Sequence, residues 1–420
     1  MTADRENSLG IYVSIPFCRS KCTYCNFASG VYPAAQHARY VERVIDDLRA
    51  AGAGAGKTGV ELPRRVGTVY LGGGTPSLLA PDLLARLFGA MRSEFDLDPD
   101  AEITVECAPG QIADDTLAAL VTAGVNRVSL GVQSFLDSEA HSSGRLHDRA
   151  AVANDLRRLR AAGIANLNVD LIAGLAGQTF ATWQESVEML VDSDVPHASV
   201  YMLEVDEDSR LGREMLAGGA RYHAGLVPSD EAIAQMYATA IERLGQAGLA
   251  QYEISNFCRA GCGSRHNLRY WQRRPYLGVG LDASSMLYAA GEPDGAHSGD
   301  VLRLTTTDDL GEFLSGLGKP EITWLSPSKQ HEEAWFLGLR LNSGVEVAAL
   351  EREFGGSLVA AALKVVPPLV EAGLLTFAAG RIRLTSQGQL LSNEVFQEFL
   401  GLESDADGEW NGSRLAGLLS

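Results

Sequence analysis

Residues 12–27 read Tyr-Val-Ser-Ile-Pro-Phe-Cys-Arg-Ser-Lys-Cys-Thr-Tyr-Cys-Asn-Phe and contain three closely spaced cysteines, Cys18, Cys22 and Cys25. An odd number of thiols this close together cannot all be paired as disulfides. Soft thiolates select iron–sulfur clusters, zinc or copper, and a structural zinc site needs four protein ligands. Three cysteines in one loop therefore predict a metal centre with one position left for another ligand. A zinc site completed by a distant histidine stays open as an alternative.

The cysteine loop follows the first of six short β-branched segments, each of which precedes an amphipathic helical pattern. The candidate strands are Tyr12–Ile15, Thr68–Leu71, Ile103–Glu106, Arg127–Leu130, Asn168–Ile172 and Ser199–Leu203. Helical patterns between them commonly end at glycine (Gly52, Gly124 and Gly163), as helix C-termini do. Repeated β/α units of this kind predict an α/β fold in which parallel strands form a partial (β/α)6 barrel. We expect this domain to cover residues 1–300.

Polar and glycine residues gather where these strands end. Gly72-Gly73-Gly74-Thr75-Pro76 follows the second strand, and Glu106, Gln133 and Asp170 stand at the ends of the next three. Ligands of parallel α/β proteins bind at the carboxyl ends of the strands, and glycines let the backbone approach a ligand closely. These residues are therefore predicted to line one site together with the cysteine loop.

Downstream of an expected linker at 301–325, the pattern changes. Helical patterns at 330–341, 347–354 and 358–371 precede two short β segments at 374–377 and 381–384. This order predicts a winged-helix-like domain over residues 326–420. Its helices carry no basic run, and the whole chain has 35 basic and 53 acidic residues with a net charge of −18. We therefore expect no nucleic-acid partner, and expect the domain to dock on or cover the barrel.

Composition and patterning also bound the location of the protein. The 420 residues are 46% hydrophobic, enough for a large core. The polar start of the chain predicts no secretory signal, and no apolar run reaches the length of about 20 residues that a membrane span requires. A cytoplasmic protein is expected, where an oxygen-sensitive centre and six unpaired cysteines would survive. Contact with a membrane surface and dimerisation stay open.

The Gly/Ala segment Ala50–Gly59 is expected to be a flexible connection. It ends in Gly56-Lys57-Thr58, like a phosphate-binding P-loop, but that pattern needs a glycine where Ala51 stands. The segment also follows a helical pattern instead of a strand, so nucleotide triphosphate binding is not expected.

The cysteine spacing, followed by the glycine motif, resembles the radical S-adenosylmethionine (SAM) superfamily. The resemblance implies that Cys18, Cys22 and Cys25 hold three irons of a 4Fe-4S cluster, with Tyr24 beside them, and that SAM chelates the fourth iron. It extends over most of the chain to one branch, the anaerobic coproporphyrinogen III oxidases and the related haem chaperones of the HemW type. The matching stretches are Tyr12–Cys18, Gly72–Pro76, Val105–Gly110, Ser129–Phe135, Gly144–His147, Asp170–Leu175, Gly177–Thr179, Gln251–Phe257 and His266–Trp271.

The same resemblance implies roles for individual residues. The expected SAM-site residues are Tyr12, Tyr24, Gly73, Gly74, Thr75, Glu106, Gln133, Arg145 and Asp170. Carboxylates suit ribose hydroxyls or an amino group, and Arg145 suits a carboxylate. His266, in His266-Asn267-Leu268-Arg269-Tyr270-Trp271, is the candidate axial ligand of haem iron.

Departures from the family pattern separate two functional hypotheses. Phe27 stands where the oxidases carry a fourth cysteine, and Ser14 and Ser284 stand where relatives usually have histidine. These residues favour a haem chaperone, which passes haem to an acceptor protein that the sequence does not identify. The alternative is a coproporphyrinogen III oxidase or another radical SAM enzyme of porphyrin metabolism. Cys258 and Cys262 are expected to be incidental thiols.

Overall fold

The computed structural model describes residues 8–291 and 297–402. The described residues form two compact units. The first runs to Tyr270 and includes Arg274–Ser298 and Leu302–Trp324 within the described ranges. The second comprises Trp271–Arg273, Gly299–Val301 and the described residues from Leu325 onward.

One large sheet organises the first unit, and within the described residues it has twelve strands in the order β12-β11-β10-β9-β1-β2-β3-β4-β5-β6-β8-β7. The strands are β1 (Leu9–Ile15), β2 (Arg65–Gly73), β3 (Asp96–Cys107), β4 (Arg127–Gln133), β5 (Asn166–Ala173), β6 (His197–Met202), β7 (Ala250–Glu253), β8 (Asn256–Cys258), β9 (Tyr276–Val279), β10 (Ser284–Tyr288), β11 (Val301–Thr305) and β12 (Glu321–Leu325). From β1 to β6 the strands lie in chain order and each is parallel to the next. The predicted α/β fold and its six strands are confirmed.

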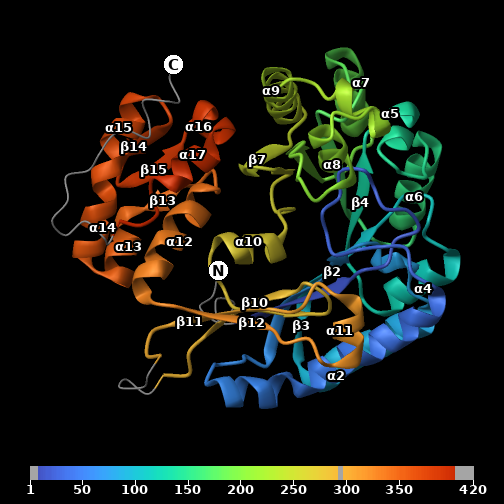
Figure 1. The fold of residues 1–420 in the computed structure, drawn as a ribbon, viewed down its shortest axis with the longest axis horizontal. Helices are drawn as coiled ribbons and strands as arrows, with labels where there is room; N and C mark the ends of the chain where they lie inside the picture. The colour runs from blue at the N-terminus through green and yellow to red at the C-terminus, as the bar shows by residue number, and fades with distance from the viewer. Residues whose placement is uncertain (1–7, 292–296, 403–420) are drawn as a thin grey trace. The chain divides into compact units, whose positions relative to one another are not determined.

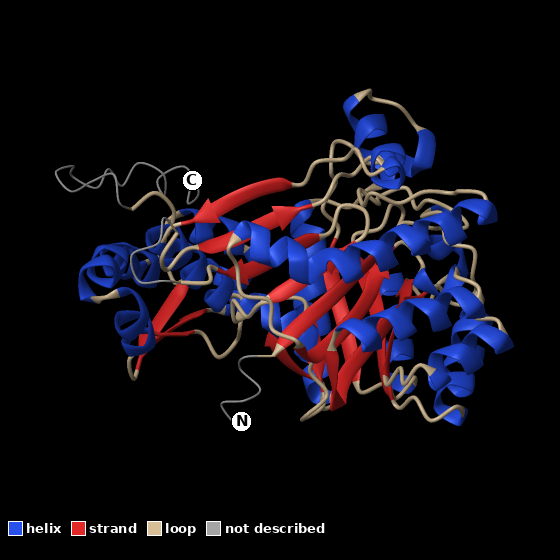
Figure 2. Cartoon of the chain, turned by 90° about the horizontal axis from the view of Figure 1, so that it is seen from below, coloured by secondary structure: helices blue, strands red, loops and turns tan. Residues whose placement is uncertain are grey.

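Helices flank this sheet, most of them on its outer side, whereas the helix Arg265–Trp271 packs on the inner side, where His266 contacts Thr68 and Tyr70 of β2 (Figures 1 and 2). The helices are α2 (Ala34–Thr58), η1 (Pro76–Leu78), α3 (Pro81–Glu94), α4 (Asp114–Thr122), α5 (Asp137–Ser142), α6 (Arg149–Ala161), α7 (Phe180–Asp192), α8 (Arg210–Leu216), η2 (Arg221–Leu226), α9 (Asp230–Gln246), α10 (Arg265–Trp271) and α11 (Leu310–Ser315). Strand β1 shows the consequence, since all its residues except the half-buried Tyr12 are buried. Burial on both faces is why β1 reads as an almost continuous apolar run in the sequence.

The expected flexible connection at Ala50–Gly59 is wrong. Helix α2 continues to Thr58 and ends at Gly59, which adopts a left-handed φ of 71°. The predicted helix end at Gly52 therefore lies inside the helix. A Cβ added at Gly52, Gly54 or Gly56 would have no described neighbour within 4 Å, so packing does not require glycine at these three helical positions. The P-loop remains excluded, because a helix leads into Lys57.

The region predicted as a linker instead contains regular secondary structure. Residues 301–325 contain β11, α11 and β12, and both strands belong to the large sheet. Gly278 lies within β9, and Gly280, just after the strand, has a left-handed φ of 100°. Strand β9 is parallel to β1, so the sheet extends on both sides of the strand that leads into the cysteine loop.

The second unit has the predicted order of helices followed by a hairpin. Its helices are α12 (Pro327–Leu339), α13 (Val347–Phe354), α14 (Gly356–Ala362), η3 (Leu363–Val365), α15 (Val366–Glu371), α16 (Ser386–Leu390) and α17 (Ser392–Gln397). Strands β14 (Leu375–Ala378) and β15 (Arg381–Leu384) pair with each other, and β13 (Val345–Glu346) adds to β15. In the part of the chain that the structure describes, no helix is long and apolar enough to cross a membrane.

Candidate SAM and cluster site

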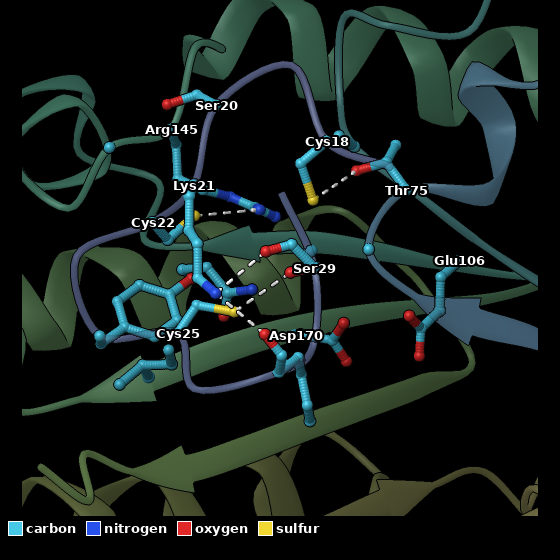
Figure 3. Close-up of a pocket in the computed structure, with 18 of the residues that line it drawn as sticks. Cys18, Ser20, Lys21, Cys22, Cys25, Ser29, Thr75, Glu106, Arg145 and Asp170 are labelled. Atoms are coloured by element: carbon cyan, nitrogen blue, oxygen red, sulfur yellow. Dashed lines mark hydrogen bonds between the residues drawn. The ribbon is translucent and has the colours of Figure 1, made fainter. Parts of the chain in front are cut away.

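The cysteine loop is closed on itself by hydrogen bonds. The Cys18 N–H donates to the Gly30 carbonyl, and the Gly30 N–H donates to the Pro16 carbonyl, both at 2.8 Å. The Lys21 ammonium donates to the carbonyls of Phe27 and Ser29, each at 3.0 Å. The loop thus presents its thiols on a fixed backbone. Cys18, Cys22 and Cys25 all line one pocket of about 540 Å³ (Figure 3).

Each thiol meets a different polar neighbour. Thr75 Oγ1 lies 4.0 Å from Cys18 Sγ, Arg145 Nη1 lies 3.6 Å from Cys22 Sγ, and Ser29 Oγ lies 3.8 Å from Cys25 Sγ. Burial raises the pKa of Cys18. The Arg145 guanidinium places a positive charge beside Cys22 Sγ.

Backbone hydrogen bonds join the glycine motif directly to the cysteine loop. The Gly74 N–H donates to the Ile15 carbonyl and the Thr75 N–H to the Phe17 carbonyl, both at 2.8 Å. A Cβ on Gly74 would lie 3.0 Å from Cys18 Sγ, so only glycine leaves this space beside the thiol. Gly73 has a φ of 101°, which also favours glycine. The backbone here forms the wall of the pocket next to Cys18.

Two carboxyl groups form the deeper part of the site. Glu106, at the end of β3, accepts from Tyr70 Oη at 2.8 Å and from the Gly73 N–H at 3.2 Å. Burial raises the pKa of Glu106 to about 7, and the nearby Asp170 carboxylate also raises it. Asp170, on β5, accepts from Ser129 Oγ at 3.1 Å and from Asn168 Nδ2 at 2.6 Å. Burial raises the pKa of Asp170 as well.

Two glycines make room at this side of the pocket, Gly131 for Arg145 and Gly144 for the cysteine loop. A Cβ on Gly131 would lie 2.2 Å from Arg145 Nη2, and one on Gly144 would lie 3.2 Å from Cys22 Cα. The buried Nε of Arg145 has no hydrogen-bond partner among the described residues. Gln133 is held at a φ of 70° beside an irregularity in the pairing of β4 with β5. Such a conformation in a residue other than glycine is costly and is commonly kept at functional sites.

Most of the predicted site residues come together in this pocket. Its lining includes Cys18, Cys22, Cys25, Tyr24, Gly73, Gly74, Thr75, Glu106, Gln133, Arg145 and Asp170. Tyr12 is not among the described lining residues; its ring lies 6.1 Å from that of Tyr70, on the barrel side of β1.

His266, the predicted haem ligand, lies in a closed environment. It is 0% exposed. Its Nδ1 is hydrogen-bonded to Thr68 Oγ1 and its Nε2 to Tyr270 Oη, both at 2.8 Å. Burial lowers the pKa of His266 to about 3, so the ring is neutral. Because both nitrogens are engaged inside the first unit, neither is presented to a ligand in this arrangement.

Several residues of the site escaped the sequence prediction. Ser129 and Asn168 hold Asp170, and Lys21 closes the cysteine loop. Asn168 and Asp170 are two apart on one strand and so share a face. That spacing was readable in the sequence. The reach of Lys21 back to carbonyls of its own loop was not.

The donor set fits an iron–sulfur cluster better than a single ion. No group of three or more His, Cys, Asp or Glu side chains within the described ranges is arranged to hold one metal ion. The three thiols instead line different parts of one pocket, beside space kept open by Gly74. A cluster takes one thiolate per iron, so separated thiols suit it.

Comparison with known proteins agrees with this geometry. The sequence model of the radical SAM superfamily matches residues 12–190, and that of the HemN C-terminal domain matches residues 325–391. The fold and the cysteine site together define a radical SAM protein, a class that implies a 4Fe-4S cluster and SAM.

Full-length relatives narrow the assignment. The chain is 33% identical to the heme chaperone HemW of Lactococcus lactis over 93% of this chain and 96% of that protein. It is 33% identical to that of Bacillus subtilis, with 93% and 98% covered, and 30% identical to that of Escherichia coli, with the same coverage. The chain therefore belongs to the HemW family. The solved structure of coproporphyrinogen III oxidase (HemN) from Escherichia coli shares the fold, with a TM-score of 0.78 at 22% identity over 94% of this chain and 90% of that one.

Proposed function

We propose that this chain is a cytoplasmic haem chaperone, which binds haem and transfers it to an acceptor protein on a radical SAM scaffold. The observation that carries the proposal is the similarity to proteins named heme chaperone over 93% of the chain. Phe27 adds support, because it lines the pocket, is 62% exposed and stands where the oxidases carry a further cysteine.

The described geometry supports a division of roles within the pocket. Cys18, Cys22 and Cys25 would hold the 4Fe-4S cluster, and Arg145 would accept the carboxylate of SAM. Glu106 and Asp170 would accept hydrogen bonds from its amino group or its ribose hydroxyls. When bound, the cluster and SAM supply one-electron chemistry. The contribution of the protein is to orient these groups.

We propose the apolar mouth of this pocket, in place of His266, as the surface for the porphyrin ring. Phe27 and Leu146 line the mouth and are 62% and 59% exposed, and Tyr201 is 41% exposed. Large exposed apolar side chains around a pocket are typical of a binding surface. A flat macrocycle would cover them, whereas binding at His266 would require one of the two hydrogen bonds of its ring to break and the fully buried ring to become accessible.

An anaerobic haem titration of cluster-reconstituted protein, followed by Soret absorption, tests the proposal. We expect saturation near one haem per chain, with weaker binding in Phe27→Ser than in the surface control Val121→Ser. The same preparations are incubated with coproporphyrinogen III, SAM and a reductant. Absence of saturable haem binding, together with formation of the decarboxylated product, would replace the chaperone by the oxidase alternative.

A further inference from the structure

Beneath the pocket, the interior of the barrel is polar. A cavity of about 40 Å³ is lined by Thr104, Asn168, His197 and Ser199, among others. Glu106 and Asp170 line both this cavity and the pocket above it. The volume suffices for about two to four water molecules at roughly 10–15 Å³ each. The buried Thr104 Oγ1, which has no partner among the described residues, is positioned to bond to one of them.

A line of hydrogen bonds runs through this interior from Tyr252 to the site. Tyr252 Oη lies 2.9 Å from His197 Nε2, and His197 Nδ1 lies 2.6 Å from Asn168 Oδ1. Asn168 Nδ2 in turn lies 2.6 Å from Asp170 Oδ1. Asn168 on β5 and His197 on β6 are register partners, so the pairing of the two strands creates the contact.

The chemistry of the amide fixes the direction of each hydrogen bond. Asn168 Oδ1 can only accept, so His197 Nδ1 must carry a proton and donate it. Burial lowers the pKa of His197 well below its usual range, so the ring is neutral and Nε2 is left as an acceptor. Nε2 therefore accepts from the Tyr252 hydroxyl, which itself accepts from the Ser264 N–H at 3.1 Å.

We propose that His197 is a positioning residue for SAM binding, which acts on Asp170 through Asn168. By holding the carbonyl oxygen of Asn168, the His197 N–H points the amide NH₂ at Asp170 and prevents the amide from turning over. A reversed amide would place an oxygen against the carboxylate. The Asp170 oxygens then keep the orientation in which they meet a ligand in the pocket. This inference rests on the proposed role of Asp170 in holding SAM.

The test measures SAM dissociation constants of cluster-reconstituted protein by equilibrium dialysis without oxygen. His197→Leu keeps bulk but removes the donor, and His197→Gln restores an N–H. We expect SAM binding to weaken about tenfold in His197→Leu, at unchanged iron and sulfide content, and to recover to within about threefold in His197→Gln. Equal binding by His197→Leu and the unaltered chain overturns the inference, as does a His197→Gln variant no better than His197→Leu.

Two further measurements separate this inference from its premise. The SAM dissociation constant of Asp170→Asn is measured alongside. If Asp170→Asn binds SAM as the unaltered chain does, the proposed site is wrong. If Asp170→Asn loses SAM binding while His197→Leu binds SAM normally, only the positioning role is rejected. Leucine at a buried polar position can prevent folding, so ¹⁵N spectra of histidine-labelled unaltered protein are recorded as well. A proton on His197 Nδ1 supports the inference, and a proton on Nε2 contradicts it. Neither result depends on haem binding.

Discussion

Replacing Gly74 by alanine tests the link between the glycine motif and the cysteine loop. The added Cβ would lie 2.8 Å from the Phe17 carbonyl oxygen and 2.9 Å from the Ile15 carbonyl oxygen. Both are backbone atoms that cannot rotate away, and both accept the hydrogen bonds that join the two segments. Breaking two such bonds, at about 0.5–1.5 kcal/mol each, lowers the free energy of unfolding by about 1–3 kcal/mol.

The strain falls on the segment that carries Cys18, so the variant is also expected to bind less iron. Denaturant unfolding of the apoprotein and iron and sulfide analysis after anaerobic reconstitution measure the two effects. The matched control is Gly89→Ala, because Gly89 lies in α3 with nothing described within 4 Å of an added Cβ. There alanine should stabilise the helix by about 0.5–1 kcal/mol. A Gly74→Ala variant with normal iron content and stability would refute the close approach.

Three other variants probe the site. Cys22→Ala should lose most of the cluster iron and sulfide, whereas Cys262→Ala should keep them, because Cys262 is not among the described residues that line the pocket; equal iron content would contradict the assignment. The folded pKa of Glu106 is raised from 4.5 to about 7, so the stability that this group contributes is present below pH 4.5 and lost as the pH rises through 7. The unaltered chain should therefore lose up to about 3 kcal/mol relative to Glu106→Gln across that range, as pH-dependent unfolding would measure. His266→Gln should lower the thermal midpoint because it disturbs two buried hydrogen bonds, yet folded protein should keep its haem stoichiometry; loss of haem without loss of stability would restore His266 as a ligand.

The strands were predictable because their sequences are buried on both faces. All six parallel strands appear where β-branched residues cluster, but only their apolar centres were predicted; β3, for example, runs from Asp96 to Cys107 instead of beginning at Ile103. The extension begins with Asp96 and Leu97, whose backbone pairs with Arg65 and Val66 of β2. Pairing of this kind depends on the neighbouring strand and leaves little trace in local composition.

The site was predictable where function is concentrated in one loop or one strand end.

Glycines failed as markers of helix ends when the helix around them was rich in alanine, as in the last turns of α2. The environment of His266 was hidden for another reason: its partners include Thr68, which is 198 residues away in the sequence. A histidine motif predicts a ligand only when the residues that would compete for its nitrogens are known.

The position of β1 in the sheet bears on the order of assembly. Gly10 pairs with Thr68 on one side and with Tyr276 on the other, so the strand behind the cysteines is enclosed only by a segment far along the chain. During synthesis the thiols emerge early, while the neighbour that completes their support is made much later. Contacts of such long sequence separation form slowly. Stable cluster insertion should therefore follow translation of β9, and nascent chains stopped before Tyr276 should hold iron poorly.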